Sequence, residues 1–170
     1  MVPVIVCVRQ DAGKKVAERG YNLILDQFAS IALTGERLAL FRREVEARGR
    51  AFDPMAVTIA RDMYVATSQA DKDAAIARNA KVHQRILNVA RSPDREGGSH
   101  ILAYSHSAEQ AETSPLIGTP DEIAAKLAAL RKVGVAYVIM SCGGSRESLR
   151  RFARDIMPAF ADERFAAVAH

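Results

Sequence analysis

The sequence predicts an α/β fold built from parallel strand–helix units, and three observations support this class. A short apolar run, then a polar or glycine-containing turn, then an amphipathic helical stretch, recurs along the 170 residues. The runs are nearly all apolar, which suits strands buried in a parallel sheet. Residues that typically begin and end helices stand at the positions where the helical apolar periods begin and end. Repeated units of this kind form either a doubly wound sheet or a (β/α)8 barrel.

The clearest unit lies near the C-terminal end. Residues 119–122 (TPDE) combine a helix N-cap, a proline at the first helical position and an acid three residues after the cap. Apolar residues then recur at helical spacing until Gly134, which supplies a helix stop. Residues 135–140 are predicted to be a strand buried on both faces, and the turn at 142–145 leads into a helix over 147–159.

Three similar units precede it, with strands expected over residues 3–8, 21–25 and 56–66. The helices after them are expected over residues 14–19, over a long stretch ending near 48, and over 71–89. Within the third strand, Arg61 and Asp62 interrupt an otherwise apolar pattern.

Residues 92–115 are polar and lack a clear period, so a long loop or lid is expected there, within a single domain of residues 1–170. Because a closed barrel needs eight units, the sequence predicts half a TIM barrel, about four parallel strands with flanking helices. The exposed sheet edges of such a half-barrel need to be covered. A second copy of the chain or a different chain is expected to cover them.

Composition narrows the choice of partners. The net charge is +4, but the arginines are scattered along helices that also carry acids, so we expect no nucleic-acid partner. Cys7 and Cys142 stand alone, without the spacing of metal ligands, which predicts a reduced, cytoplasmic protein with no metal. No apolar run approaches the ~18 residues of a membrane span, so no membrane association is expected.

Stretches from most of the chain resemble the bacterial luciferase-like flavin-dependent monooxygenases. They are PVIVCV and AERGYNLIL near the start, RDMYVATSQADKDAAIA in the middle, and IGTPDEIAAKLAALRKVGVAYVIM with SLRRFARDIMPAF near the end. The resemblance implies the second half of a (β/α)8 barrel that uses reduced FMN, or F420, to oxidise a small organic substrate. It also implies a partner half-barrel that supplies the first four strands. The alternative is a non-catalytic flavin-binding or assembly module that has lost the catalytic half.

The resemblance implies that the loop after the first strand holds the flavin phosphate. That loop contains Arg9, Gln10, Asp11 and Gly13. The free amides and positive dipole end of the following helix suit an anion, Gly13 permits close approach, and Arg9 could pair with phosphate. Asp11 would repel it. A plain solvated turn is the alternative.

Two further turns carry candidate cofactor residues. Asp26 and Gln27 follow the second strand, where the resemblance implies residues beside the flavin ring. Asp26 could instead cap the following helix. Gly143 and Gly144 follow the last strand and form a candidate anion nest, or only a tight turn and helix cap.

No catalytic residue is identified from the sequence. His100 and His106 lie in the long loop and are weak acid–base candidates, because no carboxylate or cysteine stands at a spacing that would orient them. Cys142 could be a reactive thiol at a helix start, or an inert, half-buried side chain.

Overall fold

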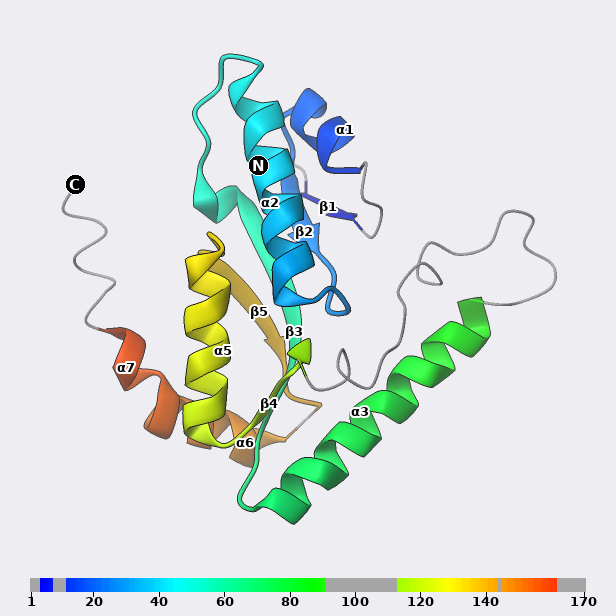
Figure 1. Cartoon of the computed structure of the whole chain (residues 1–170), viewed down its shortest axis with the longest axis vertical. Coiled ribbons are helices and arrows are strands. Elements are labelled where there is room, and N and C mark those ends of the chain that lie inside the picture. Colours follow the sequence, from blue (N-terminus) through cyan, green and yellow to red (C-terminus); the bar gives the residue numbers. More distant parts are fainter. Residues whose placement is uncertain (1–3, 8–11, 91–112, 144, 162–170) are drawn as a thin grey trace.

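The protein is a parallel α/β sheet with helices packed on one face (Figure 1). The computed structural model describes residues 4–7, 12–90, 113–143 and 145–161. The elements in chain order are β1 (Val4–Cys7), α1 (Ala12–Arg19), β2 (Asn22–Leu25), α2 (Ile31–Glu46), β3 (Val57–Val65), α3 (Gln69–Ala90), β4 (Leu116–Gly118), α5 (Pro120–Lys132), β5 (Tyr137–Ser141), α6 (Arg146–Arg151) and α7 (Pro158–Ala161).

Strand β3 is the centre of the sheet. It is nine residues long, and β2, β4 and β5 all pair with it in parallel, while β1 pairs with β2. The pairs that fix the registers are Leu23 with Val57, Thr58 with Tyr137, and Met63 with Leu116. The predicted α/β class is therefore confirmed. The sheet has one strand more than expected, because the three residues of β4 are too few to show a period.

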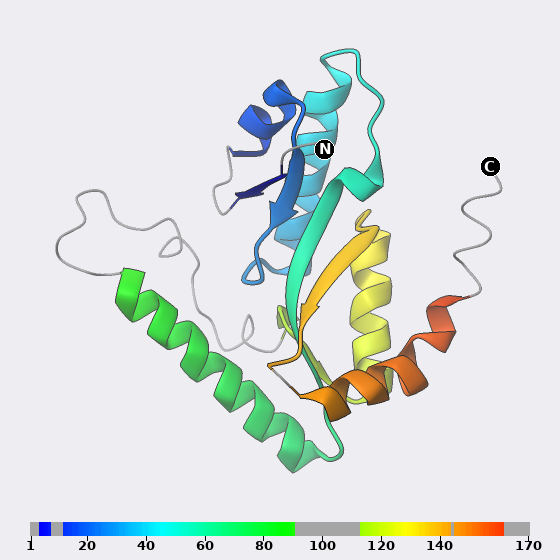
Figure 2. The ribbon, with the colours of Figure 1, turned by 180° about the vertical axis from the view of Figure 1, so that it is seen from behind.

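The core lies between the sheet and helices α2 and α5, which both cover the same face (Figures 1 and 2). Alternate residues of β2 and β3 point into it, as a strand period of two requires. Its members include Leu23, Leu25, Phe41, Val57, Ile59, Met63, Val65, Ile123, Leu130 and Ile156. Each such side chain contributes about 1.5–3 kcal/mol by leaving water.

The opposite face of the sheet is not covered by α2 or α5 (Figure 2). In β5, Val138 and Met140 pack against the core, but Tyr137 and Ile139 are each 45% exposed. The prediction that residues 135–140 are buried on both faces is therefore wrong. Among the described residues, strand β5 has a helix layer on only one side. We call this second side, which carries Tyr137, Ile139 and Ser141 together with the even-numbered residues of β3, the open face.

The local signals around α5 are confirmed. The Thr119 side chain accepts a hydrogen bond from the Glu122 amide, and the Glu122 carboxylate accepts one from the Thr119 amide, which completes the capping box. Gly134 ends the helix with a φ of 97°, a conformation that favours glycine.

The predicted helix over 147–159 is divided into α6, a π-helical stretch over Phe152–Ile156, and α7. Leu149 stands at helical spacing from the buried Phe152 and Ile156, yet it is 50% exposed, and Ser148 is buried instead. The Ser148 hydroxyl accepts a hydrogen bond from the Val65 amide at 2.8 Å, which turns Ser148 towards β3 and Leu149 towards solvent. Most of the predicted loop over 92–115 lies outside the described residues. None of the described helices is long and apolar enough to cross a membrane.

Candidate functional site

The candidate site lies at the edge of the sheet where the parallel strands end, which we call the carboxyl edge. The segments that follow β2 and β5 both start there, because β2, β3 and β5 are parallel and in register. In (β/α)8 barrels the ligand-binding residues are found at this edge. Near this edge, polar side chains form two clusters. One cluster lies on the core side of the sheet, and the other lies on the open face.

The first cluster is built on Arg61, which is 1% exposed and lies in β3. Its guanidinium donates to the carbonyl oxygens of Asp26 at 2.9 Å and Ala29 at 2.8 Å. It also donates to the Thr34 hydroxyl at 3.0 Å. Arg61 therefore fastens the segment after β2 to the central strand and to the first turn of α2. Both terminal nitrogens of the guanidinium that interrupts the apolar pattern of this strand therefore have hydrogen-bond acceptors inside the core.

Asp26 belongs to the same buried cluster. One carboxylate oxygen accepts hydrogen bonds from the amides of Phe28 at 2.8 Å and Ala29 at 3.2 Å, and the other accepts one from Arg37 at 2.9 Å. Asp26 thus closes the turn before α2, whereas the helix itself is capped by Ser30. Only 4% of the surface of Asp26 is exposed, so in this chain its carboxylate serves to hold the turn in place.

The second cluster joins β3 to α3. The Oδ2 atom of Asp62 accepts a hydrogen bond from Asn79 at 2.9 Å and lies 3.4 Å from Nε2 of His83. The His83 ring also contacts Phe28 edge-on, with the ring centroids 4.8 Å apart. The hydrogen bond from His83, helped by that from Asn79, lowers the pKa of the Asp62 carboxyl. Asp62 is therefore held as a carboxylate at the open face.

Sequence reasoning missed this second cluster. The sequence shows Asp62 only as an interruption of an apolar run and assigns no role to His83. Two signals were available. Asp62 falls on the side of β3 opposite its core residues, and Asn79 and His83 are four residues apart, hence neighbours on one helix face.

The N-terminal turns of α3 are also tied to β3. The carboxylate of Asp71 accepts hydrogen bonds from the Tyr64 hydroxyl at 3.0 Å and the Thr67 amide at 2.9 Å. These bonds lower the pKa of Asp71, that from the Thr67 amide most of all. The guanidinium of Arg78 lies over the Tyr64 ring, 5.3 Å from its centroid. Side chains between Asp71 and His83 thus attach helix α3 to β3.

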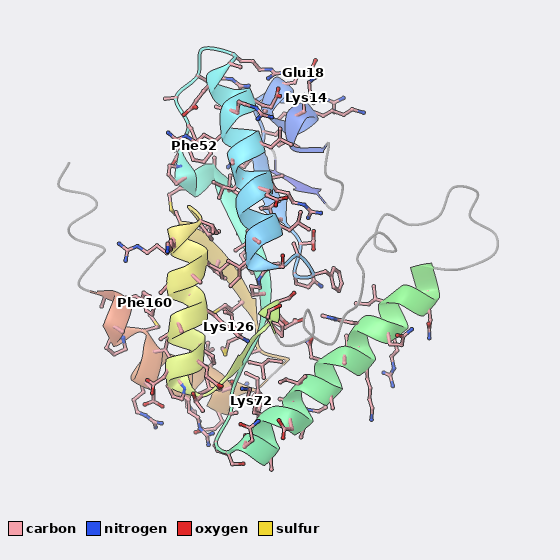
Figure 3. The ribbon with its side chains drawn as sticks, in the orientation of Figure 1. Lys14, Glu18, Phe52, Lys72, Lys126 and Phe160 are labelled. Atoms are coloured by element: carbon pink, nitrogen blue, oxygen red, sulfur yellow. The ribbon has the colours of Figure 1, made fainter. Side chains whose placement is uncertain are left out.

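Two lysines join α3, β4 and α5, and Figure 3 labels both. Lys72 of α3 forms an ion pair with Glu122 of α5 at 2.6 Å. Lys126 of α5 donates to the carbonyl oxygens of Pro115 at 2.8 Å and Ile117 at 3.3 Å. The hydrogen bond from Lys72 is the largest cause of a lowered pKa at Glu122. These contacts hold the short strand β4 in place at the end of β3.

Comparison with known proteins identifies the family. A family model described as luciferase-like monooxygenase matches residues 2–137. The chain belongs to the luciferase-like monooxygenase family. No curated protein matches it. The resemblance noted in the sequence is confirmed.

Solved structures of similar fold include an enzyme in complex with FMN and an F420-dependent enzyme. The monooxygenase RslO1 of Streptomyces bottropensis is 18% identical with a TM-score of 0.66, over 92% of this chain and 47% of that one. The oxygenating constituent of 3,6-diketocamphane monooxygenase of Pseudomonas putida, in complex with FMN, is 13% identical with a TM-score of 0.65, over 91% and 47%. The coenzyme F420-dependent tetrahydromethanopterin reductase of Methanopyrus kandleri is 14% identical with a TM-score of 0.62, over 92% and 50%.

This luciferase-like chain therefore spans about half the length of the structures that it matches. Its sheet is open, with β1 and β5 pairing on one side only among the described strands. Both findings agree with a partial (β/α)8 barrel, as predicted.

The structure describes four of the predicted cofactor residues, and all four follow the ends of strands in one sheet. Gly13 is buried in the first turn of α1, where an added Cβ would lie 3.8 Å from Phe41, so its side faces α2. Asp26 is in the buried cluster, and Gln27 beside it is half-buried. Gly143 has a φ of 56° and an exposed backbone with open space around it. The other predicted residues, Arg9, Gln10, Asp11, Gly144, His100 and His106, lie outside the described residues.

Proposed function

We propose that this chain is the C-terminal half of a luciferase-like, flavin-dependent oxidoreductase or monooxygenase. One observation carries the proposal: a chain of this family forms half of a parallel barrel whose strand ends and open face lie on the side where a barrel holds its ligand. The cofactor is FMN, with F420 as the alternative, since similar folds are found in complex with FMN and in an F420-dependent enzyme.

The phosphate of the flavin would be held where α1 begins. This helix starts at Ala12, shortly after β1 ends, so its free amides and positive dipole end lie at the carboxyl edge. Arg9 and the exposed Lys14 would add positive charge, Gln10 and Asp11 belong to the loop before the helix, and Gly13 lies in its first turn. Gly143 and Gly144 form a second position at which backbone amides could approach an anion.

When bound, the reduced flavin supplies the electrons for oxygen activation or hydride transfer. The residues of this chain would position the ring and keep water from it. Asp26 acts indirectly, because its pair with Arg37 fixes the turn that carries Gln27 and Phe28 to the carboxyl edge. His100 and His106 are the candidates for moving protons, since imidazole titrates near neutral pH.

A working site needs a second half-barrel. Strands β1 and β5 each present one edge without a described partner strand, and Tyr137 and Ile139 of the open face are exposed. Another copy of this chain, or a different chain with the first four strands, would pair with these edges and cover the face. The alternative function is a module that binds flavin or assembles with other chains without catalysing a reaction.

Titration of the purified chain with FMN and with F420, in separate experiments, tests the proposal. Saturable quenching of cofactor fluorescence is expected of the chain, and cofactor-dependent consumption of NAD(P)H or oxygen is expected of the enzyme once the second half-barrel is bound. Binding without turnover in that assembly favours the module. If neither cofactor binds at any concentration, both flavin functions are wrong.

A further inference from the structure

A second polar residue lies beside Asp62 on the open face. Asp62 of β3 is directly paired with Ser141 of β5, and paired residues of parallel strands share a face. The Asp62 side chain is 28% exposed, and Ser141 is exposed. The two side chains form a polar pair at the carboxyl edge of the sheet.

The two oxygens of Asp62 are used differently. Asn79 and His83 both approach Oδ2, and no hydrogen bond among the described residues involves Oδ1. The Ser141 hydroxyl likewise makes no hydrogen bond within the described part of the chain. An ionised carboxylate oxygen can only accept, whereas a hydroxyl can donate and accept. The pair therefore offers an acceptor and a donor next to each other.

An apolar surface adjoins this polar pair. One step back along the open face, Ala60 of β3 is paired with Ile139 of β5, and Tyr137 follows one step further. Ile139 and Tyr137 are each 45% exposed. A largely apolar wall with a few polar groups at one end is the usual composition of a small-molecule site.

We propose that Asp62 and Ser141 bind a hydroxyl group of a polyol or alcohol ligand that lies on the open face. The ligand hydroxyl donates to Oδ1 of Asp62 and accepts from the Ser141 hydroxyl. An amide N–H group of a ligand could donate to Asp62 but could not accept from Ser141, and an anion would be repelled by the Asp62 carboxylate. The hydroxyl-bearing part of a ligand is thus placed here and its phosphate elsewhere. This inference deepens the proposed function and rests on it for taking the open face as the ligand side.

Ribitol is a suitable probe because it has hydroxyl groups and neither a ring nor a phosphate. We expect it to cause saturable NMR shifts at Asp62 and Ser141 in the isotopically labelled full chain. Ser141→Ala removes the hydroxyl, and Asp62→Asn replaces the charged acceptor with a neutral amide, so each should weaken ribitol binding on the order of tenfold. Asp73→Asn is the matched control, because Asp73 is exposed on α3 and bonded only to Gln69 within the described chain.

The Ser141 variant keeps the result interpretable if Asp62→Asn loosens α3, because Ser141 does not contact that helix through any hydrogen bond of the described chain. The absence of saturable shifts at these two residues would overturn the inference. Unchanged ribitol affinity in both variants would also overturn it. Flavin titration is a separate experiment. Ribitol binding at this site without flavin binding would support the inference and contradict the proposed function. Flavin binding without ribitol binding would support the proposed function and contradict the inference.

Discussion

Replacing Arg61 with methionine removes the donors that fasten the segment after β2. Methionine keeps much of the volume, but the carbonyls of Asp26 and Ala29 and the hydroxyl of Thr34 each lose a hydrogen bond from the guanidinium. Each loss of a buried partner costs about 1–3 kcal/mol, and relief of the buried charge offsets part of the total. We expect a net loss of about 3–5 kcal/mol, a large part of the ~5–15 kcal/mol that stabilises a domain.

Urea unfolding followed by far-ultraviolet circular dichroism measures this loss. With a slope of about 2 kcal/mol per molar, the midpoint should fall by roughly 1.5–2.5 M. Arg42→Met is the matched control. Arg42 pairs with Glu46 at 2.8 Å, but the two side chains are 60% and 47% exposed, so at most about 1 kcal/mol is expected. If the Arg61 variant is no less stable than the Arg42 variant, Arg61 does not fasten this segment.

Three further changes test separate parts of the structure. Thr119→Ala removes the capping box with Glu122 and should cost about 1 kcal/mol in urea unfolding, and a loss below a few tenths would contradict that role. Gly134→Ala forces a side chain into a φ of 97°, 3.1 Å from Leu38, so the melting temperature should fall; an unchanged value would contradict the strain. Asp62 has a lowered pKa in the folded state, so its contribution is present above its unfolded pKa and is lost as pH falls through the folded one. The stability advantage of wild type over Asp62→Asn should therefore shrink on acidification, and a constant difference between pH 6 and pH 2 would contradict it.

The parts of the fold that the sequence predicts well depend on local interactions. The capping box at Thr119 and the stop at Gly134 involve residues within one or two turns of a helix, so their pattern is visible along the chain. The apolar period of α2 likewise identifies Leu38, Phe41 and Val45, which are buried. The order of strands and helices follows from such signals.

The parts that were missed depend on distant partners. The apolar sequence of β5 predicts a fully buried strand, and only the sheet shows that Tyr137 and Ile139 lie on a face that no described helix covers. Arg61 reads as a break in a strand, because its acceptors lie 27–35 residues away in sequence.

The candidate site was predicted less completely than the fold. Its position at the strand ends follows from parallel βα units, which is why Asp26 and Gly143 were identified as residues at this edge. Their roles were not, because the Arg37 partner of Asp26 is supplied by another element. Asp62 and His83 come together only through the direction in which α3 crosses the edge.

Sedimentation equilibrium at micromolar concentration tests most directly whether the half-barrel associates through its open edges. We predict a mass at least twice the 18.5 kDa of the chain. Ile139→Lys, which places a charge on the open face beside the β5 edge, should shift the equilibrium towards the monomer. A single 18.5 kDa species of the wild-type chain over the whole concentration range would contradict the account.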